Sequence, residues 1–258
     1  MKITVLASGS KGNCICVEGG SGTILIDAGI SNRDIRRRMA EAGADAGDVE
    51  GLFLTHEHSD HIRGVDVFCR GSGVAVHGTK GTLSGLAPTL KKPGALKLHP
   101  MAHGEGVACG DFTVTTFHTS HDAAEPSGFC IREGDVTLGV CTDTGMVTPA
   151  MLAYLRRCDA VILESNHCPV MLVEGRYPAF LKRRIADTKR GHLSNPAAAA
   201  VLRHLCADLS HVVLAHLSEE NNTPEKALAT AHEGLGLYAG NQQVAVARQH
   251  TISDSFEV

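Results

Sequence analysis

Four candidate metal ligands, three histidines and one aspartate, stand on one short segment, residues 55–61, with the sequence THEHSDH. The spacing His-x-His-x-Asp-His would arise by chance in only about 0.003 of chains of this composition. His56 and His58 are two residues apart, so in an extended turn they project to the same side and can bind one ion. Asp60 and His61, at the entry of the next helix, can reach a second ion. Three nitrogen ligands and one oxygen ligand favour zinc, with manganese or iron as alternatives.

One segment cannot complete two metal shells, so further ligands are expected at the ends of other strands, where α/β scaffolds place reactive groups. The candidates are His118 and His121 after the apolar run 112–117, Asp143 after the run 136–141, and His216 within the run 212–217. A carboxylate that bridges two metals is what the set still needs, and Asp143 could supply it. In its Cys-Thr-Asp-Thr-Gly context, Asp143 has an alternative reading as a turn or cap residue.

The elements that must position these residues follow from the hydrophobic pattern. Short apolar runs predict strands; they cover residues 3–7, 23–26, 52–55, 74–77, 112–117, 136–141, 160–163 and 212–217. Helical spacing, often opening on Pro or Thr-Pro, predicts helices; these cover residues 32–42, 62–69, 149–156, 179–187, 196–206 and 224–234. No repeat or linker interrupts the chain, so residues 1–258 are expected to form a single α/β domain of layered sheets with helices outside.

Composition narrows the class of protein. The 258 residues are 43% hydrophobic and 20% charged, which is typical of a globular protein and excludes a disordered or fibrous one. No run approaches the roughly 18 apolar residues of a membrane span, and the first residues lack the apolar core of a signal peptide, so a cytoplasmic location without membrane contact is expected. Nine cysteines without a Cys-x-x-Cys pair predict reduced thiols. Fifteen histidines are compatible with metal or proton chemistry.

The net charge of −4 excludes a wholly basic protein that coats nucleic acid. Two local basic clusters remain, one within residues 33–38 and the other within residues 182–190. Each could contact phosphates or could simply be a solvated helix face.

The order of these motifs resembles the metallo-β-lactamase fold superfamily over nearly the whole chain. The resemblance implies a four-layer αββα sandwich with two divalent metal ions at one edge of the sheets. It implies one metal on His56, His58 and His121, a second on Asp60, His61 and His216, and Asp143 bridging both. Asp27, in Leu-Ile-Asp-Ala-Gly, matches an Asp-x-Gly that lies behind the metal site and holds a histidine tautomer, although an ordinary Asp-Gly turn fits it as well.

The branch of the family can be narrowed further. An Asp at position 143 resembles the phosphodiesterase branches, whereas true β-lactamases commonly have Cys there, and here Cys141 is two residues away. Five segments are similar to the YycJ/WalJ subfamily, which is related to ribonuclease Z and to the β-CASP nucleases: residues 7–14, 120–123, 164–167, 191–195 and 214–222. The Ser-His-Asp-Ala match at residues 120–123 favours His121 over His118 as the ligand.

Two further residues gain roles from this resemblance. Glu164 and His192 resemble the acidic and Gly-His motifs of the β-CASP group, although the chain is too short to hold the inserted β-CASP domain. His192 would then meet the scissile phosphate, and either stabilise the transition state or protonate the leaving oxygen, with Glu164 orienting either a neighbouring ligand or His192 itself. Ser194, close to His192, is expected to contact the substrate. Ser8 lies in a polar loop that could offer N–H groups to phosphate or could be a plain strand-to-strand turn.

The resulting hypothesis is a di-metal hydrolase that cleaves DNA or RNA from an end, with a hydroxide held between the metals attacking phosphorus and with Asp60 and Asp143 orienting it. The low aromatic content of 4% argues against a base-stacking groove for long single strands. A small-molecule hydrolase on the same site, such as a β-lactamase, a thioester hydrolase or a cyclic phosphodiesterase, is the main alternative. A regulatory protein with a vestigial site is a third. The sequence leaves the oligomeric state open.

Overall fold

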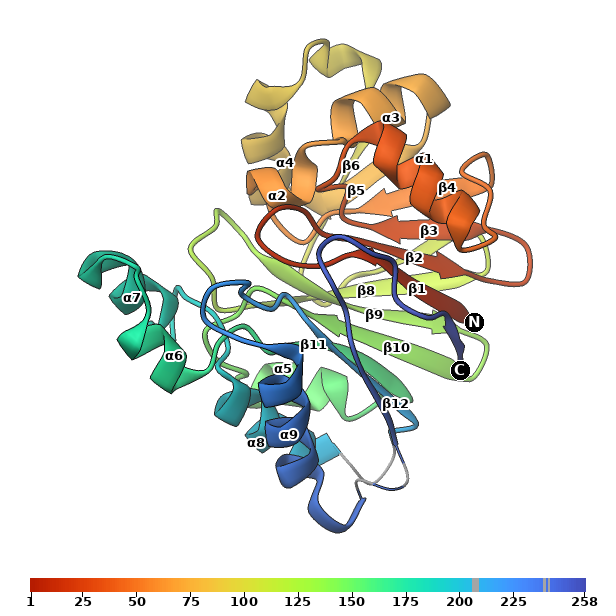
Figure 1. The fold of residues 1–258 in the computed structure, drawn as a ribbon. Helices are drawn as coiled ribbons and strands as arrows, with labels where there is room; N and C mark the ends of the chain where they lie inside the picture. The colour runs from red at the N-terminus through yellow and green to blue at the C-terminus, as the bar shows by residue number, and fades with distance from the viewer. Residues whose placement is uncertain (206–208, 239, 241) are drawn as a thin grey trace.

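Two mixed β-sheets packed face to face form the centre of the molecule (Figure 1). The computed structural model describes residues 1–205, 209–238, 240 and 242–258. Within these ranges each sheet has seven strands. The strand orders are β14-β1-β2-β3-β4-β5-β6 and β13-β12-β11-β10-β9-β8-β7, so each half of the chain builds most of one sheet.

The strands of the first sheet are β1 (Lys2–Ala7), β2 (Cys14–Glu18), β3 (Thr23–Ile26), β4 (Val49–Phe53), β5 (Ala75–Thr79), β6 (Leu98–Met101) and β14 (Phe256–Glu257). Those of the second are β7 (Gly106–Cys109), β8 (Phe112–His118), β9 (Ser127–Glu133), β10 (Val136–Cys141), β11 (Ala160–Glu164), β12 (His211–Ala215) and β13 (Gln243–Val246). β3 to β6 run parallel to one another, and so do β10 to β13. Parallel strands place their carboxyl ends at one edge, where ligands commonly bind.

Helices cover the outer face of each sheet (Figure 1). The first sheet carries α1 (Asn32–Glu41), α2 (Ser59–Ile62), α3 (Val65–Ser72) and α4 (Lys80–Leu86), followed by the 3-10 turns η1 (Ala87–Thr89) and η2 (Pro93–Ala95). The second carries α5 (Pro149–Leu155), α8 (Asn195–Leu205), α9 (Pro224–Leu235) and the turn η3 (Gly236–Tyr238). Two short helices, α6 (Pro169–Glu174) and α7 (Ala179–Ile185), project away from the sheets. No helix in the described ranges is long and apolar enough to span a bilayer.

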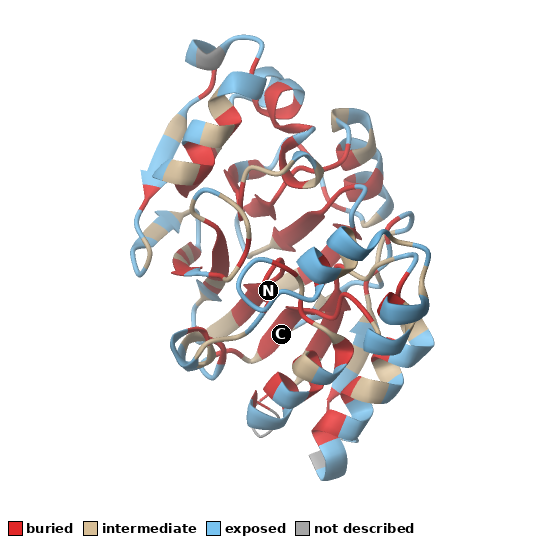
Figure 2. Ribbon diagram, turned by 90° about the vertical axis from the view of Figure 1, so that its left-hand side faces the viewer, coloured by how far each residue is buried: buried red, intermediate tan, exposed pale blue. Residues whose placement is uncertain are grey.

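Successive side chains along a strand point alternately to the two faces of its sheet, and this alternation explains the layers. In β3, Ile24 and Ile26 belong to the core between the sheets, whereas Leu25 packs in the core under α1 and α3. In β11, Ile162 faces the inner core and Leu163 the core under α5, α8 and α9. A strand that is apolar on both faces needs cover on both sides, so the layers stack as αββα, as expected from the sequence. Figure 2 shows the strands as the most buried part of the molecule.

Helix starts follow the predicted signals. Thr148 and Thr223 precede α5 and α9, each with Pro at the first helical position, and their hydroxyls accept hydrogen bonds from backbone N–H groups of the first turn. Ser31 caps α1 in the same way. These side chains satisfy donors that would otherwise have no partner at the start of a helix.

The single helix predicted over residues 62–69 is instead two helices, α2 and α3, with Gly64 at the break. The Gly64 N–H donates to the carbonyl of Ala28, and a Cβ at Gly64 would lie 2.2 Å from the Ile30 oxygen. The close approach of two backbones therefore breaks the helix. Strands β2, β6, β7, β9, β13 and β14 and helices α4 and α6 are additions to the prediction. The predicted end of the helix at Cys206 lies outside the described residues.

The two chain ends lie side by side (Figure 1). β14 pairs with β1, placing Glu257 opposite Lys2. Upstream of β14, Ser253 bonds both backbone groups of Val5, and the Arg248 carbonyl accepts from the Ser8 N–H. The last part of the chain therefore runs along the open edge of β1.

Candidate metal centre

The predicted ligands gather where the loops that follow β3, β4, β8, β10 and β12 meet, at one end of both sheets. Because the parallel strands of each sheet point the same way, their following loops reach one common edge. The structure thus brings together side chains that are up to 160 positions apart in the sequence, from His56 to His216.

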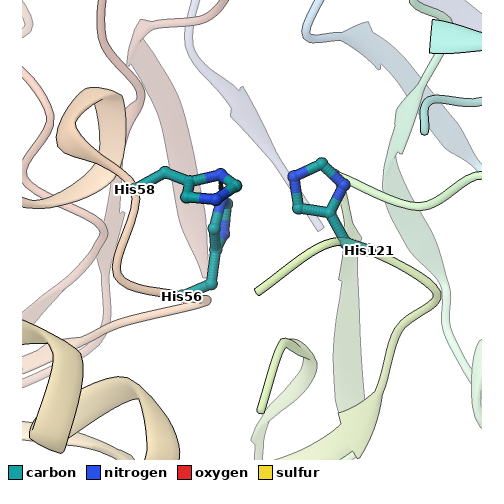
Figure 3. A group of neighbouring side chains, drawn as sticks. All are labelled: His56, His58 and His121. Atoms are coloured by element: carbon teal, nitrogen blue, oxygen red, sulfur yellow. Dashed lines mark hydrogen bonds between the residues drawn. The ribbon is translucent and has the colours of Figure 1, made fainter. Parts of the chain in front are cut away.

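His56, His58 and His121 form the first group of ligands. Figure 3 shows His56 and His58 on one loop, facing His121 on another. One ring nitrogen from each lies within 4.8 Å of the others. His56 Nε2 and His58 Nδ1 are 3.0 Å apart, so both nitrogens point to one place, as their spacing in the sequence predicts. His118, the rejected candidate, is exposed and packs instead on His103.

Asp60, His61 and His216 form the second group, also within 4.8 Å of one another. Asp60 Oδ2 lies 3.5 Å from His61 Nε2 and 3.6 Å from His216 Nε2. Both imidazoles are buried, and Asp60 is partly exposed. Two segments of the chain, one from each sheet, therefore contribute to each group.

Asp143 lies between the two groups. Its Oδ2 is 3.3 Å from His61 Nε2, and its Oδ1 is 3.5 Å from His216 Nε2 and 3.8 Å from His121 Nε2. The carboxylate is buried and touches members of both groups. This is the position that a bridging ligand requires, and it is not that of a surface turn residue.

Hydrogen bonds behind the site fix which ring nitrogen faces inward. His61 Nδ1 lies 2.7 Å from Asp27 Oδ2, and Asp27 also accepts from the backbone N–H and the hydroxyl of Thr55. His121 Nδ1 lies 3.1 Å from the Gly191 carbonyl, which can only accept. In both histidines the Nδ1 proton is held from behind, so the Nε2 lone pair is directed at the centre, as metal ligation needs.

The pKa values of two histidines of the first group, His56 and His121, reflect burial. Removal from water disfavours the charged imidazole and lowers the pKa of His56 well below its ordinary value, and the nearby His61 adds to this. Burial also lowers the pKa of His121. These rings are therefore neutral at neutral pH, which is the form that binds a metal.

The second group behaves in the opposite way. Burial disfavours the charged form of His216, but carboxylates around the ring, with Asp143 foremost, outweigh burial and raise its pKa to about 10. His61 also has a raised pKa, because Asp27 and Asp143 outweigh its burial. Buried carboxylates thus bring negative charge that only a cation, either a proton or a metal ion, can balance.

The donor set fits two divalent metal ions. Asp143 Oδ2 and His216 Nε2 are buried and have no hydrogen-bond partner among the described residues. Leaving such atoms unsatisfied costs about 1–3 kcal/mol each, so their chemistry suits a bound cation. Imidazole nitrogens with few carboxylate oxygens are typical of zinc sites, and the carboxylates of Asp60 and Asp143 are ligands that manganese also accepts.

The backbone is strained at the same place. In the described part of the chain, the non-glycine residues with positive φ are Asp27, Asp143 and His216, at 60°, 54° and 54°. This left-handed conformation is uncommon for residues with a side chain and costs of the order of 1–3 kcal/mol each. All of them belong to the centre or directly support it, so the surrounding packing holds the strain where side chains must be aimed.

Glu164 and His192 lie beside the second group. His192 Nδ1 is 2.7 Å from Glu164 Oε1, and the same oxygen is 3.3 Å from His216 Nδ1. The backbone N–H groups of Thr144 and Leu193 donate to the other oxygen. Burial raises the pKa of Glu164, but His192 and the hydrogen bonds outweigh it and bring the pKa to about 2. An ionised Glu164 thus orients both histidines.

The two serines predicted to contact substrate have observed contacts elsewhere. The Ser8 hydroxyl accepts from the His216 backbone N–H at 2.7 Å, so Ser8 supports the loop of a predicted ligand. Ser194 precedes α8, and its hydroxyl accepts from the Ala197 N–H at 3.4 Å, as a helix cap does. A contact of either residue with substrate stays a prediction.

Sequence reasoning missed several residues of the centre. Thr55 contacts Asp27, His56 and His61, and Asp122 binds Arg184 at 2.7 Å. Both adjoin predicted ligands in the sequence, which is the signal that could have found them. The acceptor role of the Gly191 carbonyl carries no such signal, because any residue has a carbonyl.

Comparisons with known proteins agree with this geometry. Residues 22–217 match the family described as the Beta-lactamase superfamily domain. The chain is 36% identical over 236 residues to exodeoxyribonuclease YycJ of Bacillus anthracis, covering 91% of this chain and 89% of the relative. It is 35% identical over 246 residues to exodeoxyribonuclease WalJ of Streptococcus pneumoniae serotype 2, covering 92% and 91%. The crystal structure of the metallo-β-lactamase fold protein YhfI from Bacillus subtilis shares the fold, with a TM-score of 0.74 at 15% identity over 98% of both chains. The chain therefore belongs to the metallo-β-lactamase superfamily.

Proposed function

We propose that this protein is a metal-dependent exonuclease that acts on DNA. The observation that carries the proposal is the position of Asp143, whose carboxylate touches both groups of ligands. Bridged pairs of divalent ions suit the in-line displacement at phosphorus that cleaves a phosphodiester. Similarity to proteins named exodeoxyribonucleases over about nine tenths of the chain supports DNA as the substrate.

Two divalent ions, zinc or manganese and less favourably iron, would be held by seven residues: His56, His58 and His121 on one ion, Asp60, His61 and His216 on the other, and Asp143 on both. When bound, they would supply Lewis-acid activation of the phosphodiester and of water. Asp60, at the partly exposed side of the centre, would both hold a metal and orient the attacking water.

His192 would act on the substrate itself. Its Nδ1 is engaged by Glu164, so the other ring nitrogen is left to contact the scissile phosphate or to give a proton to the leaving oxygen. Glu164 would keep the ring in one tautomer and one orientation. Ser8 and Ser194 would add polar contacts near the phosphate.

A single catalytic domain over residues 1–258, without a β-CASP insertion, would carry out this reaction in the cytoplasm. The basic run within residues 182–190 would guide the phosphate backbone, since phosphate contacts supply much of the affinity for nucleic acid.

The direct test is a substrate panel. Protein loaded with zinc or manganese would be incubated with end-labelled single-stranded and duplex DNA, with RNA, with bis-p-nitrophenyl phosphate and with nitrocefin. We expect stepwise shortening of DNA from an end and no turnover of nitrocefin. Asp135→Asn, at an exposed strand turn, is the matched control for changes in the centre. Hydrolysis of nitrocefin without cleavage of any phosphodiester would contradict the proposal.

A further inference from the structure

A small cavity opens beside His192, between the metal centre and the projecting segment of residues 169–185, which we call the arm. The arm consists of α6, the bend after it and α7, and Figure 1 shows it standing away from both sheets. The cavity has a volume of about 170 Å³. Pockets for whole drug-sized ligands usually measure about 300–1,000 Å³, so this one suits a part of a molecule, such as one end of a strand.

The two walls of the cavity differ in chemistry. The arm supplies an apolar wall made of Tyr177, Leu181 and Ile185. The opposite wall belongs to the centre and holds His192 and His216. An apolar aromatic wall facing a polar, cation-binding wall matches the two halves of a nucleotide, a flat base and an anionic phosphate.

Arg184, on α7, also lines the cavity. Its Nε donates to Asp122 Oδ2 at 2.7 Å, and Asp122 follows the predicted ligand His121 directly in the sequence. A guanidinium has five N–H donors, so this bond fixes its place and leaves its terminal amino groups for an anion. The side chain is about half exposed, which keeps it open to a substrate.

We propose that this cavity binds the terminal nucleotide of the DNA strand, with Tyr177 stacked on the base and Arg184 on the phosphate. The proposal rests on the exonuclease function above and deepens it, because it names the part of the substrate that is recognised. The arm closes one side of the cavity, and the volume admits no second nucleotide. The site therefore prefers an end to the interior of a strand.

Binding and turnover test this assignment separately. The first measurement is calorimetric titration of thymidine 5′-monophosphate into the metal-free full-length protein. The second is kcat and KM on short single-stranded DNA with the metal-loaded protein. Tyr177→Ala and Arg184→Ala should each weaken nucleotide binding and raise KM by about tenfold, with kcat changed much less. Tyr177→Phe, which keeps the ring, should behave like the unaltered protein.

Two residues of the arm serve as matched controls, because they are exposed, do not line the cavity and lie outside the basic run within residues 182–190: Phe180→Ala and Arg176→Ala should change both readouts less than twofold. Equal effects of the test and control variants would overturn the assignment. If the protein cleaves no DNA but binds the nucleotide in a manner that needs Tyr177 and Arg184, the cavity assignment stands and the exonuclease function falls. If the protein cleaves DNA and neither variant changes KM or nucleotide binding, the exonuclease function stands and the cavity assignment falls.

Discussion

The two sheets contribute to the centre in different ways. The first sheet supplies His56, His58, Asp60 and His61 from one loop after β4, where the turn and the start of α2 fix their directions locally. The second sheet supplies His121, Asp143 and His216 from loops after different strands. Each of these has its direction set by packing against distant parts of the chain.

The groups that hold the ligands in place also differ between the two halves of the centre, that is, between the ligands from the first sheet and those from the second. On the first sheet, the side chain of Asp27 holds His61. On the second, a backbone carbonyl holds His121, and Ser8, from the other sheet, holds the backbone of His216. The side chain that supports the contiguous motif therefore comes from the loop after the neighbouring strand of the same sheet, whereas the dispersed ligands are supported from the other sheet or from a distant loop. Left-handed backbone occurs in both halves, at Asp27 in the first and at Asp143 and His216 in the second.

The change with the largest expected effect removes the residue that joins the halves. Asp143→Asn should lower DNA cleavage by roughly a thousandfold or more, because a neutral amide cannot balance the charge of two ions or bridge them. Metal content by mass spectrometry and cleavage rate would be measured together. Retention of both metals and of activity would show that the halves do not need a shared carboxylate. Asp135→Asn controls for loss of an aspartate alone.

A smaller effect is expected from His192, which contacts Glu164 of the second sheet but is not among the predicted ligands. His192→Ala should lower kcat by about a hundredfold and leave metal content unchanged. The pH profile of kcat should lose the limb that reports a proton donor. Full activity of this variant towards DNA would remove the role given to His192.

The hydrogen bond between His61 and Asp27, which supports the ligands of the first sheet, can be weakened without changing any ligand. Asp27→Asn should lower metal affinity by about ten- to a hundredfold, since it removes the charged partner of His61 while the ligand itself stays. Competition with a chelator, followed by metal analysis, measures this change. An unchanged affinity would mean that the loop after β4 aims His61 without help.

A histidine outside the centre shows how strongly neighbouring carboxylates change the pKa of a buried imidazole. His77 on β5 is buried, stacks on Phe53 at 4.6 Å between ring centroids, and lies near His99; burial, with His99 adding, lowers its pKa to about 4. His216 is buried too, yet its pKa is raised to about 10. Carboxylate neighbours, rather than burial, make this difference.

The sign of the stability effect of His77 follows. The pKa of a histidine in the unfolded chain is about 6.5, whereas that of His77 in the folded protein is about 4. Between these pH values the unfolded chain therefore binds more protons than the folded protein. The free energy of unfolding consequently decreases as the pH falls from about 6.5 towards 4. The unaltered protein should lose free energy of unfolding when the pH is lowered from about 7 to about 5. In His77→Phe this loss should be smaller by about 2 kcal/mol. Denaturant unfolding at both pH values measures it. An equal loss in both proteins would contradict the lowered pKa.

The predictions of the αββα arrangement and of the two ligand groups rested on two kinds of signal in the sequence. One is the spacing of residues within a motif, and the other is resemblance to a family. The run at residues 55–61 could be read directly, because its spacing alone brings ligands together. Choosing His121 over His118 needed the family resemblance, since both follow the same strand. The break at Gly64 could not be predicted, because it arises from contact with the backbone of Ile30, which is distant in the sequence.

Three of the strands missed in the sequence have physical reasons that the structure shows. β7 and β13 lie at the edges of the second sheet and alternate half-buried with exposed residues, so their short apolar stretches are only partly covered. β9 is mostly buried but is interrupted by Gly128, whose missing side chain makes room for the ring of Phe117. Such packing is visible only in three dimensions.

The course of the last residues along β1 has a consequence for solubility. An uncovered strand edge is a template for pairing with another chain, and proteins commonly protect it. Here Ser253 and β14 occupy the backbone groups of β1 that would otherwise be open. A chain trimmed before Arg248 would keep every predicted metal ligand and would still be expected to self-associate through the bared edge of β1.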